Sequence, residues 1–245
     1  NNSEMQNCTV EDWMVAGDGL IGGLVGTNHA SNANIPTIKD CTVRNFHARQ
    51  TNTALGADRN NYMMFGGITP WLHVTSVENC VVEDTSFTYV VTGSYAPMIG
   101  GIAGKMSEGA TIKNCVANIR ARVGKEDGDN AVLVGGLVGY GESPGSWMPN
   151  NTIEQCLAAV DFQMVESISC MPGYDYVNGR DATAETVSVT KPGSVYAGGL
   201  VGGVYSYKSA SAKVTNIKDC FASGTLATEY IATNDSALGG LIGAV

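Results

Sequence analysis

Cysteine has the clearest capacity for chemistry in this chain, because six of its seven copies share one local sequence. Each of the six follows an apolar residue and two polar residues, as in IKDC and VENC. They are Cys8, Cys41, Cys80, Cys115, Cys156 and Cys220, and Cys170 lies outside the pattern. No CxxC pair occurs, and side chains that recur along an axis do not converge on one metal ion. We therefore expect no metal and no cofactor at these thiols.

A second group with metal-binding chemistry is the acidic stretch GKEDGDN at residues 124–130. Glu126, Asp127 and Asp129 could offer oxygen ligands to Ca²⁺, which prefers carboxylates and carbonyls. A solvated acidic turn is the simpler interpretation. We regard these three residues as a weak calcium candidate.

Catalytic motifs are less convincing. In GESPG (141–145) the GxSxG pattern is met, but all three histidines precede the serine, which is the reverse of the hydrolase order. No HExxH zinc motif occurs. Carboxylates between 161 and 185 could supply an acid and a base for glycan cleavage, although scattered surface carboxylates are the default interpretation. We expect a protein that is not an enzyme.

A glycine-rich hexapeptide of the type VGGLVG alternates with the cysteine motif. Its six copies lie at 21–26, 65–70, 99–104, 134–139, 197–202 and 238–243, and one follows each patterned cysteine. Two half-motifs in fixed order with variable gaps are typical of a repeat with loop insertions. One such unit buries too little apolar surface to offset the entropy of ordering it, so the units must stack.

The spacing around each cysteine predicts a corner. Ile38 and Cys41 are three positions apart whereas Cys41 and Val43 are two apart, so a straight strand cannot point all three inward. A turn just before the cysteine resolves this, and Asn and Asp tolerate the left-handed conformation that it needs. The turn residues are Asn7, Asp40, Asn79, Asn114, Gln155 and Asp219. The glutamine fits least well.

The position two before the cysteine alternates in charge. From the second unit onward it reads Lys39, Glu78, Lys113, Glu154 and Lys218. Parallel stacking of the units would place each Lys beside a Glu. It would also hold equivalent cysteines about 4.8 Å apart, whereas disulfide Cβ atoms lie roughly 3.8 Å apart. We expect a buried column of free thiols.

Composition agrees with an all-β protein. The chain has 31 glycines, 44% hydrophobic residues and only 15% charged residues, with Val, Thr, Ser and Asn prominent. Its net charge of −9 and its lack of a Lys/Arg cluster argue against nucleic acid and anionic membrane surfaces as partners. No apolar run approaches the roughly 18 residues of a membrane-spanning helix, so direct membrane insertion is not expected.

Taken together, the GGLVG and TIKNC half-motifs closely resemble the GLUG repeat of bacterial surface proteins, which also occurs in the non-catalytic regions of some immunoglobulin-cleaving surface metallopeptidases. The resemblance covers about residues 5–243. It implies a parallel β-solenoid on an exported, adhesin-like protein, and it implies no catalytic residues because the repeat is structural.

Two units depart from the pattern. In FGGITPWLH, Pro70 replaces the last glycine, so we expect the strand to end there and Trp71 to turn outward. Residues 161–195 form a loop insertion between the fourth and fifth repeats, each counted as a hexapeptide with the cysteine motif that follows it. We expect this insertion to protrude.

Aromatic residues follow the hexapeptides, and stacking should bring their loops to one edge. With the tyrosines of the insertion, the speculative ligand site comprises Trp71, His73, Tyr140, Trp147, Tyr174, Tyr176, Tyr205 and Tyr207. Exposed aromatic side chains near Asn and Ser commonly recognise sugars or proteins. The alternative is that they only cover the bases of the loops.

We therefore expect a single all-β domain over residues 1–245, a parallel β-solenoid (β-helix) of about six rungs that is a fragment of a longer exported protein. Its expected role is non-catalytic adhesion or ligand binding, at a bacterial cell surface or outer membrane or in secreted form. Its expected partners are a host or microbial glycan or surface protein, and the flanking domains of its own chain. The alternatives are a polysaccharide lyase or hydrolase on a β-helix, and a structural spacer for a neighbouring domain.

Overall fold

The structure, a computed structural model, consists of β-strands and contains no helix in the part of the chain that it describes. That part comprises residues 3–17, 19–27, 35–49, 63–91, 97–126, 131–142, 148–169, 174–175, 180–181, 186–189, 193–205, 214–228 and 236–245. Within these ranges no helix is long and apolar enough to cross a membrane.

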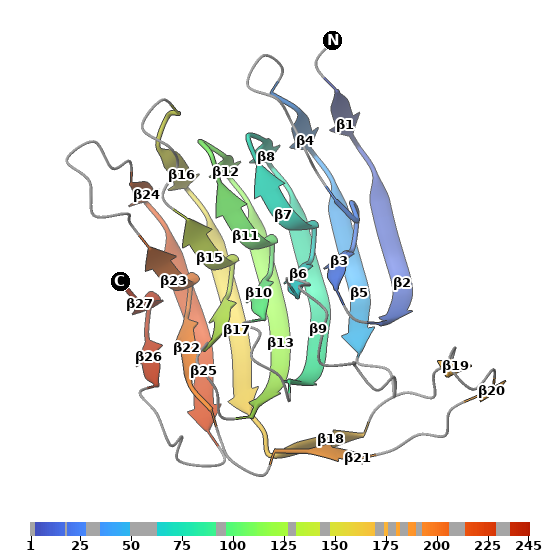
Figure 1. The fold of residues 1–245 in the computed structure, drawn as a ribbon. Helices are drawn as coiled ribbons and strands as arrows, with labels where there is room; N and C mark the ends of the chain where they lie inside the picture. Colours follow the sequence, from blue (N-terminus) through green and yellow to red (C-terminus); the bar gives the residue numbers. More distant parts are fainter. Residues whose placement is uncertain are drawn as a thin grey trace.

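Four parallel sheets form the body of the molecule, and each turn of the chain passes through them in the same order (Figure 1). The short sheet precedes the cysteines and contains β1 (Glu4–Gln6), β4 (Thr37–Lys39), β8 (Ser76–Glu78), β12 (Thr111–Lys113), β16 (Asn151–Glu154) and β24 (Thr215–Lys218). The long sheet follows them and contains β2 (Thr9–Ala16), β5 (Thr42–Arg49), β9 (Val81–Val91), β13 (Val116–Lys125), β17 (Leu157–Met164) and β25 (Phe221–Thr228).

The glycine hexapeptides contribute the other two sheets. The glycine sheet contains β3 (Leu20–Gly22), β6 (Met64–Gly66), β10 (Met98–Gly100), β14 (Val132–Gly135), β22 (Val195–Gly198) and β26 (Ala237–Gly239). The aromatic sheet contains β7 (Thr69–His73), β11 (Ala103–Ser107), β15 (Val138–Glu142), β23 (Val201–Tyr205) and β27 (Ile242–Ala244). Four strands from four sheets make one turn, and we call each turn a rung.

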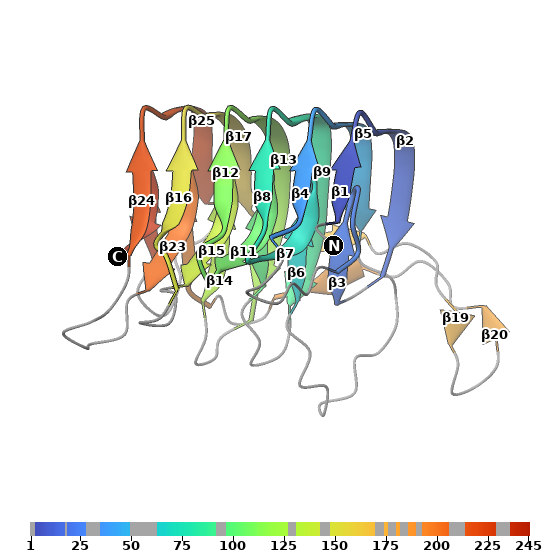
Figure 2. The same ribbon diagram turned by 90° about the horizontal axis from the view of Figure 1, so that it is seen from above.

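Rungs stack in chain order, one per repeat, as Figure 2 shows from above. In the short sheet the register pairs Ile38 with Val77, Val77 with Ile112, and Ile112 with Ile153. The short, long and glycine sheets each have six strands. The fold is therefore the expected parallel β-solenoid of about six rungs. The charged residues two positions before the cysteines also have the expected register, since Lys39, Glu78 and Lys113 are direct neighbours on adjacent strands.

The corner before each cysteine has the left-handed backbone that the spacing predicts. Positive φ values between 51° and 56° occur at Asn7, Asp40, Asn79, Asn114, Gln155 and Asp219. Gln155 thus adopts the conformation although glutamine suits it poorly. The ladder continues around the corner, because the Asp40 amide donates to the Glu78 carbonyl at 3.0 Å.

A second corner, which the sequence analysis missed, divides the first three rungs from the others. Asp12, Asn45 and Asp84 also have positive φ, near 50°, and each lies four residues after its cysteine. They add one residue to β2, β5 and β9, and the register shifts where β9 meets β13 between Ala117 and Ile119. This is a β-bulge. Its signal was visible in the sequence as an Asn or Asp at a constant offset in three units.

The double glycine of the hexapeptide lies where successive backbones meet at a bend. A Cβ atom on Gly136 would collide with the Gly199 carbonyl of the next rung and would lie 2.7 Å from the Ala158 Cβ. Amide hydrogen bonds nevertheless continue through the bend, from Leu137 to the Leu200 carbonyl at 2.9 Å. The repeated glycines are therefore needed for close backbone approach.

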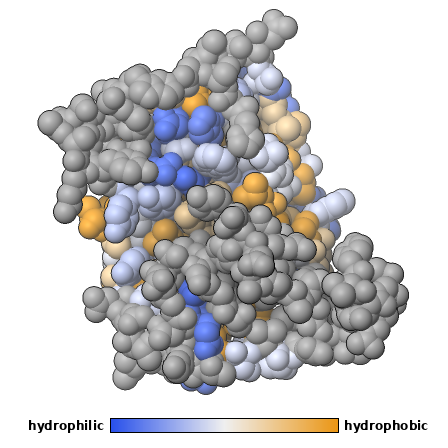
Figure 3. All heavy atoms as spheres, in the orientation of Figure 1, coloured by the Kyte–Doolittle hydropathy of each residue, from blue (hydrophilic) through white to orange (hydrophobic). Residues whose placement is uncertain are grey.

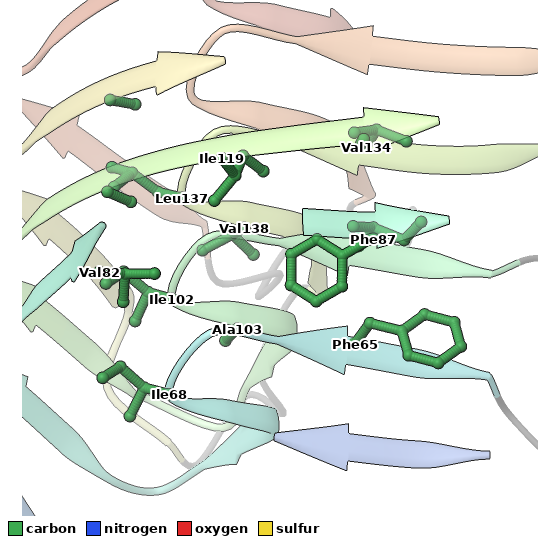
Figure 4. Close-up of a cluster of buried hydrophobic side chains, with 14 of the residues drawn as sticks. Phe65, Ile68, Val82, Phe87, Ile102, Ala103, Ile119, Val134, Leu137 and Val138 are labelled. Atoms are coloured by element: carbon green, nitrogen blue, oxygen red, sulfur yellow. The ribbon is translucent and has the colours of Figure 1, made fainter. Parts of the chain in front are cut away.

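Apolar side chains from the sheets fill the interior (Figure 4). Phe65 stacks on Tyr89 with ring centroids 4.1 Å apart, and Ile68, Ile102 and Leu137 occupy equivalent places after the double glycines with no exposed area. This continuous core is what a single repeat could not form alone.

The two units that depart from the repeat pattern differ in part from what the sequence predicts. The strand was expected to end at Pro70, but β7 continues through it to His73. Proline is tolerated there because β7 is the edge strand of the aromatic sheet, where a missing N–H costs no ladder bond. Trp71 alternates outward from the buried Leu72 yet is itself half-buried.

The insertion begins later than predicted, because residues 161–164 still belong to β17. It then forms an antiparallel pair of β18 (Ser167–Ser169) with β21 (Thr186–Ser188) and a second pair of β19 (Tyr174–Asp175) with β20 (Arg180–Asp181). The first pair packs on the solenoid, since Ile168 and Val165 contact Val90. The β19–β20 pair lies away from the rungs (Figures 1 and 2).

Candidate functional site

The outer side of the aromatic sheet gathers polar and aromatic residues from consecutive rungs. Strand alternation turns Leu72 and Met106 inward with no exposed area, so the residues on either side of them point outward. One outward column runs through Trp71, Lys105, Tyr140 and Gly203. Its neighbour includes His73 opposite Ser107, and Glu142 opposite Tyr205.

Lys105 is the centre of this group. Its ammonium nitrogen lies 5.2 Å from the Trp71 ring centroid and 5.8 Å from that of Tyr140, within cation–π range of both. Its Nζ is also 3.0 Å from Glu142 Oε2. Lys105 is only 9% exposed. Its charge is therefore compensated by one carboxylate and two ring faces.

Other side chains contact the rings of Trp71 and Tyr140 as well. The Trp71 indole N–H donates to Ser107 Oγ at 2.9 Å, and the His73 ring meets Trp71 edge-on at 5.3 Å. Tyr205 lies 6.4 Å from Tyr140 and is 69% exposed. We call Trp71, Lys105, Tyr140, Glu142 and Tyr205 the aromatic cluster. It can offer a preformed π surface that carries no uncompensated charge.

Four of the eight predicted ligand residues, Trp71, His73, Tyr140 and Tyr205, meet on this sheet. They lie on strands, so the expected loop edge is in fact a sheet face. Tyr174 is in β19, away from the cluster (Figure 2), and Trp147, Tyr176 and Tyr207 lie outside the described residues.

Lys105 and Glu142 are site residues that the aromatic pattern alone does not predict. Their signal was the register, since Lys105 lies six residues after the first residue of its hexapeptide, as Trp71 and Tyr140 do. Aligning the hexapeptides would have placed the lysine between the two rings.

Figure 3 shows the molecule from the side of Figure 1. Among the described residues visible there, blue polar and orange apolar residues are interleaved over the glycine and aromatic sheets. A mixed surface of this kind suits a ligand with both hydroxyl groups and apolar faces.

The cysteine column lies on the inner side of the long sheet. Cys41, Cys80, Cys115 and Cys156 are fully buried, Cys8 and Cys220 are half-buried, and all six are free thiols. Successive thiols are linked through the backbone, because the Cys80 amide donates to Cys115 Sγ at 3.4 Å.

The thiol pKa shifts differ in direction along this column, because hydrogen bonds with Cys115 lower the pKa of Cys80 and of Cys156. Hydrogen bonds with the thiols of Cys156 and Cys80, together with burial, raise the pKa of Cys115 far above its ordinary value. Burial likewise raises the pKa of Cys41 and of Cys220. The column acts as a stack of small apolar residues.

The corner residues form a hydrogen-bonded ladder on the surface. Asp40 accepts from the side-chain amides of Gln6 and Asn79, both at 3.0 Å, and Asn114 donates to Asn79 at 3.2 Å. The bonds from Asn79 and Gln6 lower the pKa of the Asp40 carboxyl. Lys39 makes its ion pair with Glu4 at 3.0 Å, and this contact raises the pKa of the lysine.

The calcium candidate lies mostly outside the described residues. Glu126 follows β13, and Asp127 and Asp129 are not described. Within the described ranges, no three His, Cys, Asp or Glu side chains gather closely enough to hold a metal ion.

Comparison with known proteins gives one match. The family model described as "The GLUG motif" matches residues 193–227, which run from the end of the insertion through β22, β23 and β24 into β25. A GLUG motif is therefore present in this solenoid. No curated protein and no solved structure matches the chain.

Proposed function

We propose that this solenoid is a non-catalytic module that binds a glycan through the aromatic cluster, as part of an exported, adhesin-like bacterial protein at the cell surface or outer membrane, or in secreted form. The observation that carries the proposal is the placement of the Trp71 and Tyr140 rings on either side of the neutralised Lys105. Tyr205 is 69% exposed and the other two rings are half-buried, and aromatic rings with polar neighbours suit the apolar faces and hydroxyl groups of sugar rings.

The charge state of the cluster favours a neutral ligand. Lys105 already pairs with Glu142 at 3.0 Å, so an anionic ligand would have to compete with that carboxylate. The rings of Trp71 and Tyr140 are two rungs apart, about 9.6 Å at strand spacing. An extended oligosaccharide could therefore contact both rings with sugar units that are not adjacent.

Glycan-array screening followed by calorimetry tests the proposal. Tyr205→Ala and Trp71→Ala should each weaken binding at least about tenfold, and affinity should change little with salt because the cluster is neutral. Phe221→Ala is the matched control, since it removes an exposed ring from the long sheet. A positive array with unchanged affinity in both cluster variants would contradict the proposal. A negative array would favour a protein ligand or the spacer role.

A polysaccharide-cleaving enzyme is the second candidate, and one observation favours it. Arg44 lies between Glu11 and Glu83 on the long sheet, with N–O distances of 3.4 and 3.0 Å. Glycoside hydrolysis uses two carboxyl groups on one face, and Glu11 and Glu83 flank Arg44 in this way. All three side chains are about half exposed, however, and they neutralise one another. Release of reducing ends that depends on Glu11 and Glu83 would establish the enzyme and overturn the binding module.

A further inference from the structure

The outer face of the long sheet carries a ridge of exposed apolar residues in rungs four to six. The residue directly after each cysteine points outward, and parallel register aligns these residues from rung to rung. From the first rung to the sixth they are Thr9, Thr42, Val81, Val116, Leu157 and Phe221. The last three are 37%, 49% and 61% exposed. From Val116 to Phe221, side-chain size and exposure thus both increase.

The neighbouring outward column, three residues after each cysteine, has the opposite gradient. It reads Glu11, Arg44, Glu83, Asn118, Ala159 and Ser223. The register aligns Glu11, Arg44 and Glu83 in the first half, and Asn118, Ala159 and Ser223 in the second. Rungs one and two therefore carry threonine beside the longer Glu11 and Arg44, whereas rungs five and six carry Leu157 and Phe221 beside the smaller Ala159 and Ser223.

Charge on this face also alternates by rung. Strand β5 has Arg44 and Arg49 and no acid, and β9 has acidic residues but no base. Strand β13 has Arg120 and Arg122 and no acid, and β17 has Asp161 and no base. Within one chain the neighbouring rungs already pair, because Arg44 contacts Glu83 and Arg120 contacts Asp161.

We propose that the outer face of the long sheet binds a second copy of this chain, packed face to face with the rung order reversed. Rung one then lies on rung six, rung two on rung five, and rung three on rung four. Val116 then meets Val81, and the larger Leu157 and Phe221 meet the smaller Thr42 and Thr9. A two-fold axis relates the copies, so every contact is made twice.

Reversed rung order also places rungs of opposite charge on one another. The rung with Asp161 lies on the rung with Arg44 and Arg49, and the rung with Arg120 lies on the rung with Glu83 and Asp84. Packing in the same rung order would instead place each rung on its twin, with like charges opposed, which is unfavourable. The sequence of this face therefore selects one relative orientation.

The face is large enough for a stable interface. Six strands at about 4.8 Å span about 29 Å, and eight residues at about 3.3 Å span about 26 Å. The face thus covers roughly 750 Å² on each copy. Both copies together bury about 1,500 Å², within the range of specific protein interfaces.

Sedimentation equilibrium on the full chain tests self-association. Wild type should form a concentration-dependent dimer, and Leu157→Asp should raise the dimer dissociation constant at least about tenfold. Tyr205→Asp is the matched control, because it places the same charge on an exposed residue of the aromatic sheet and should leave the dimer intact. Circular dichroism verifies folding. Phe221→Asp, on a more exposed residue, repeats the test if the first variant misfolds.

Cross-linking tests the rung order. Glu11→Cys on one copy and Ser223→Cys on another should cross-link in a mixture, whereas Glu11→Cys alone should not exceed the wild-type background. A monomer at all concentrations would overturn the proposal, as would a dimer that Leu157→Asp and Phe221→Asp leave unchanged. Cross-linking of Glu11→Cys to itself would show that the rung order is kept, which contradicts the reversed packing.

Discussion

Successive rungs place cysteine over cysteine in the interior, but on the aromatic sheet they place Lys105 over Trp71 and Tyr140 over Lys105. Both columns use the same strand spacing. In the interior every rung meets the same constraint, so the same residue recurs. On the outer face a contact is made with something else, so each rung can differ. Residues that recur in every rung therefore specify the stacking of the rungs. Residues that differ between rungs are free to serve a function.

The largest effect on stability should come from the most constrained repeating position. Gly136→Ala should lower the free energy of unfolding by about 3 kcal/mol, because its Cβ would collide with the Gly199 carbonyl. Gly240→Ala is the matched control at the equivalent place in the sixth rung, where nothing lies within 4 Å. Equal losses in urea denaturation would contradict the close-approach explanation.

A buried position that repeats should also control the response to alkaline pH. The pKa of Cys41 is raised above its ordinary 9.0, chiefly by burial. Above about pH 9 the unfolded chain loses this proton while the folded chain keeps it, so stability present below that pH is lost as pH rises. Wild type should therefore lose stability above pH 9 more steeply than Cys41→Ala. If wild type and the variant lost stability equally with rising pH in chemical denaturation, this thiol would not be the source of the pH dependence.

The corner should show a smaller effect. Asn114→Ala should cost about 1 to 2 kcal/mol, because alanine disfavours a φ of 51°. Asn114→Gly should recover most of this loss, since glycine adopts the left-handed region without strain. Thermal denaturation of both variants measures the difference. If glycine were as destabilising as alanine, the hydrogen bond to Asn79 and not the backbone would explain the asparagine.

The smallest stability effect should occur on the aromatic sheet. Tyr205→Ala should change the free energy of unfolding by no more than about 0.5 kcal/mol, because the side chain is 69% exposed. The same variant should weaken glycan binding. Large destabilisation without a change in binding would show that Tyr205 has a structural role. It would then contradict the difference drawn between the interior cysteine column and the outer face of the aromatic sheet.

The repeating half of the molecule could be predicted from the sequence almost completely. The three-then-two spacing around Cys41 led to the left-handed corner, and the alternation of Lys39, Glu78 and Lys113 led to the register. These inferences succeeded because each was repeated, so one physical constraint was seen several times. The corner at Asp12, Asn45 and Asp84 carried a similar signal but appears in only half of the rungs.

The candidate site was less predictable because it depends on pairing between rungs that differ. Trp71 and Tyr140 could be identified as aromatic residues that follow the hexapeptides, but the ion pair of Lys105 with Glu142 joins adjacent strands and requires the register. Pro70 misled the analysis because its cost depends on whether β7 is an edge strand. That is a property of the sheet and not of the local sequence.

Alkylation of the folded chain, followed by mass spectrometry, tests the stacked interior most directly. The account predicts that Cys41, Cys80, Cys115 and Cys156 stay unmodified until the chain unfolds, whereas Cys8 and Cys220 react slowly as half-buried thiols at the end rungs. Rapid labelling of the four inner thiols, or masses that show disulfides among them, would contradict the parallel solenoid.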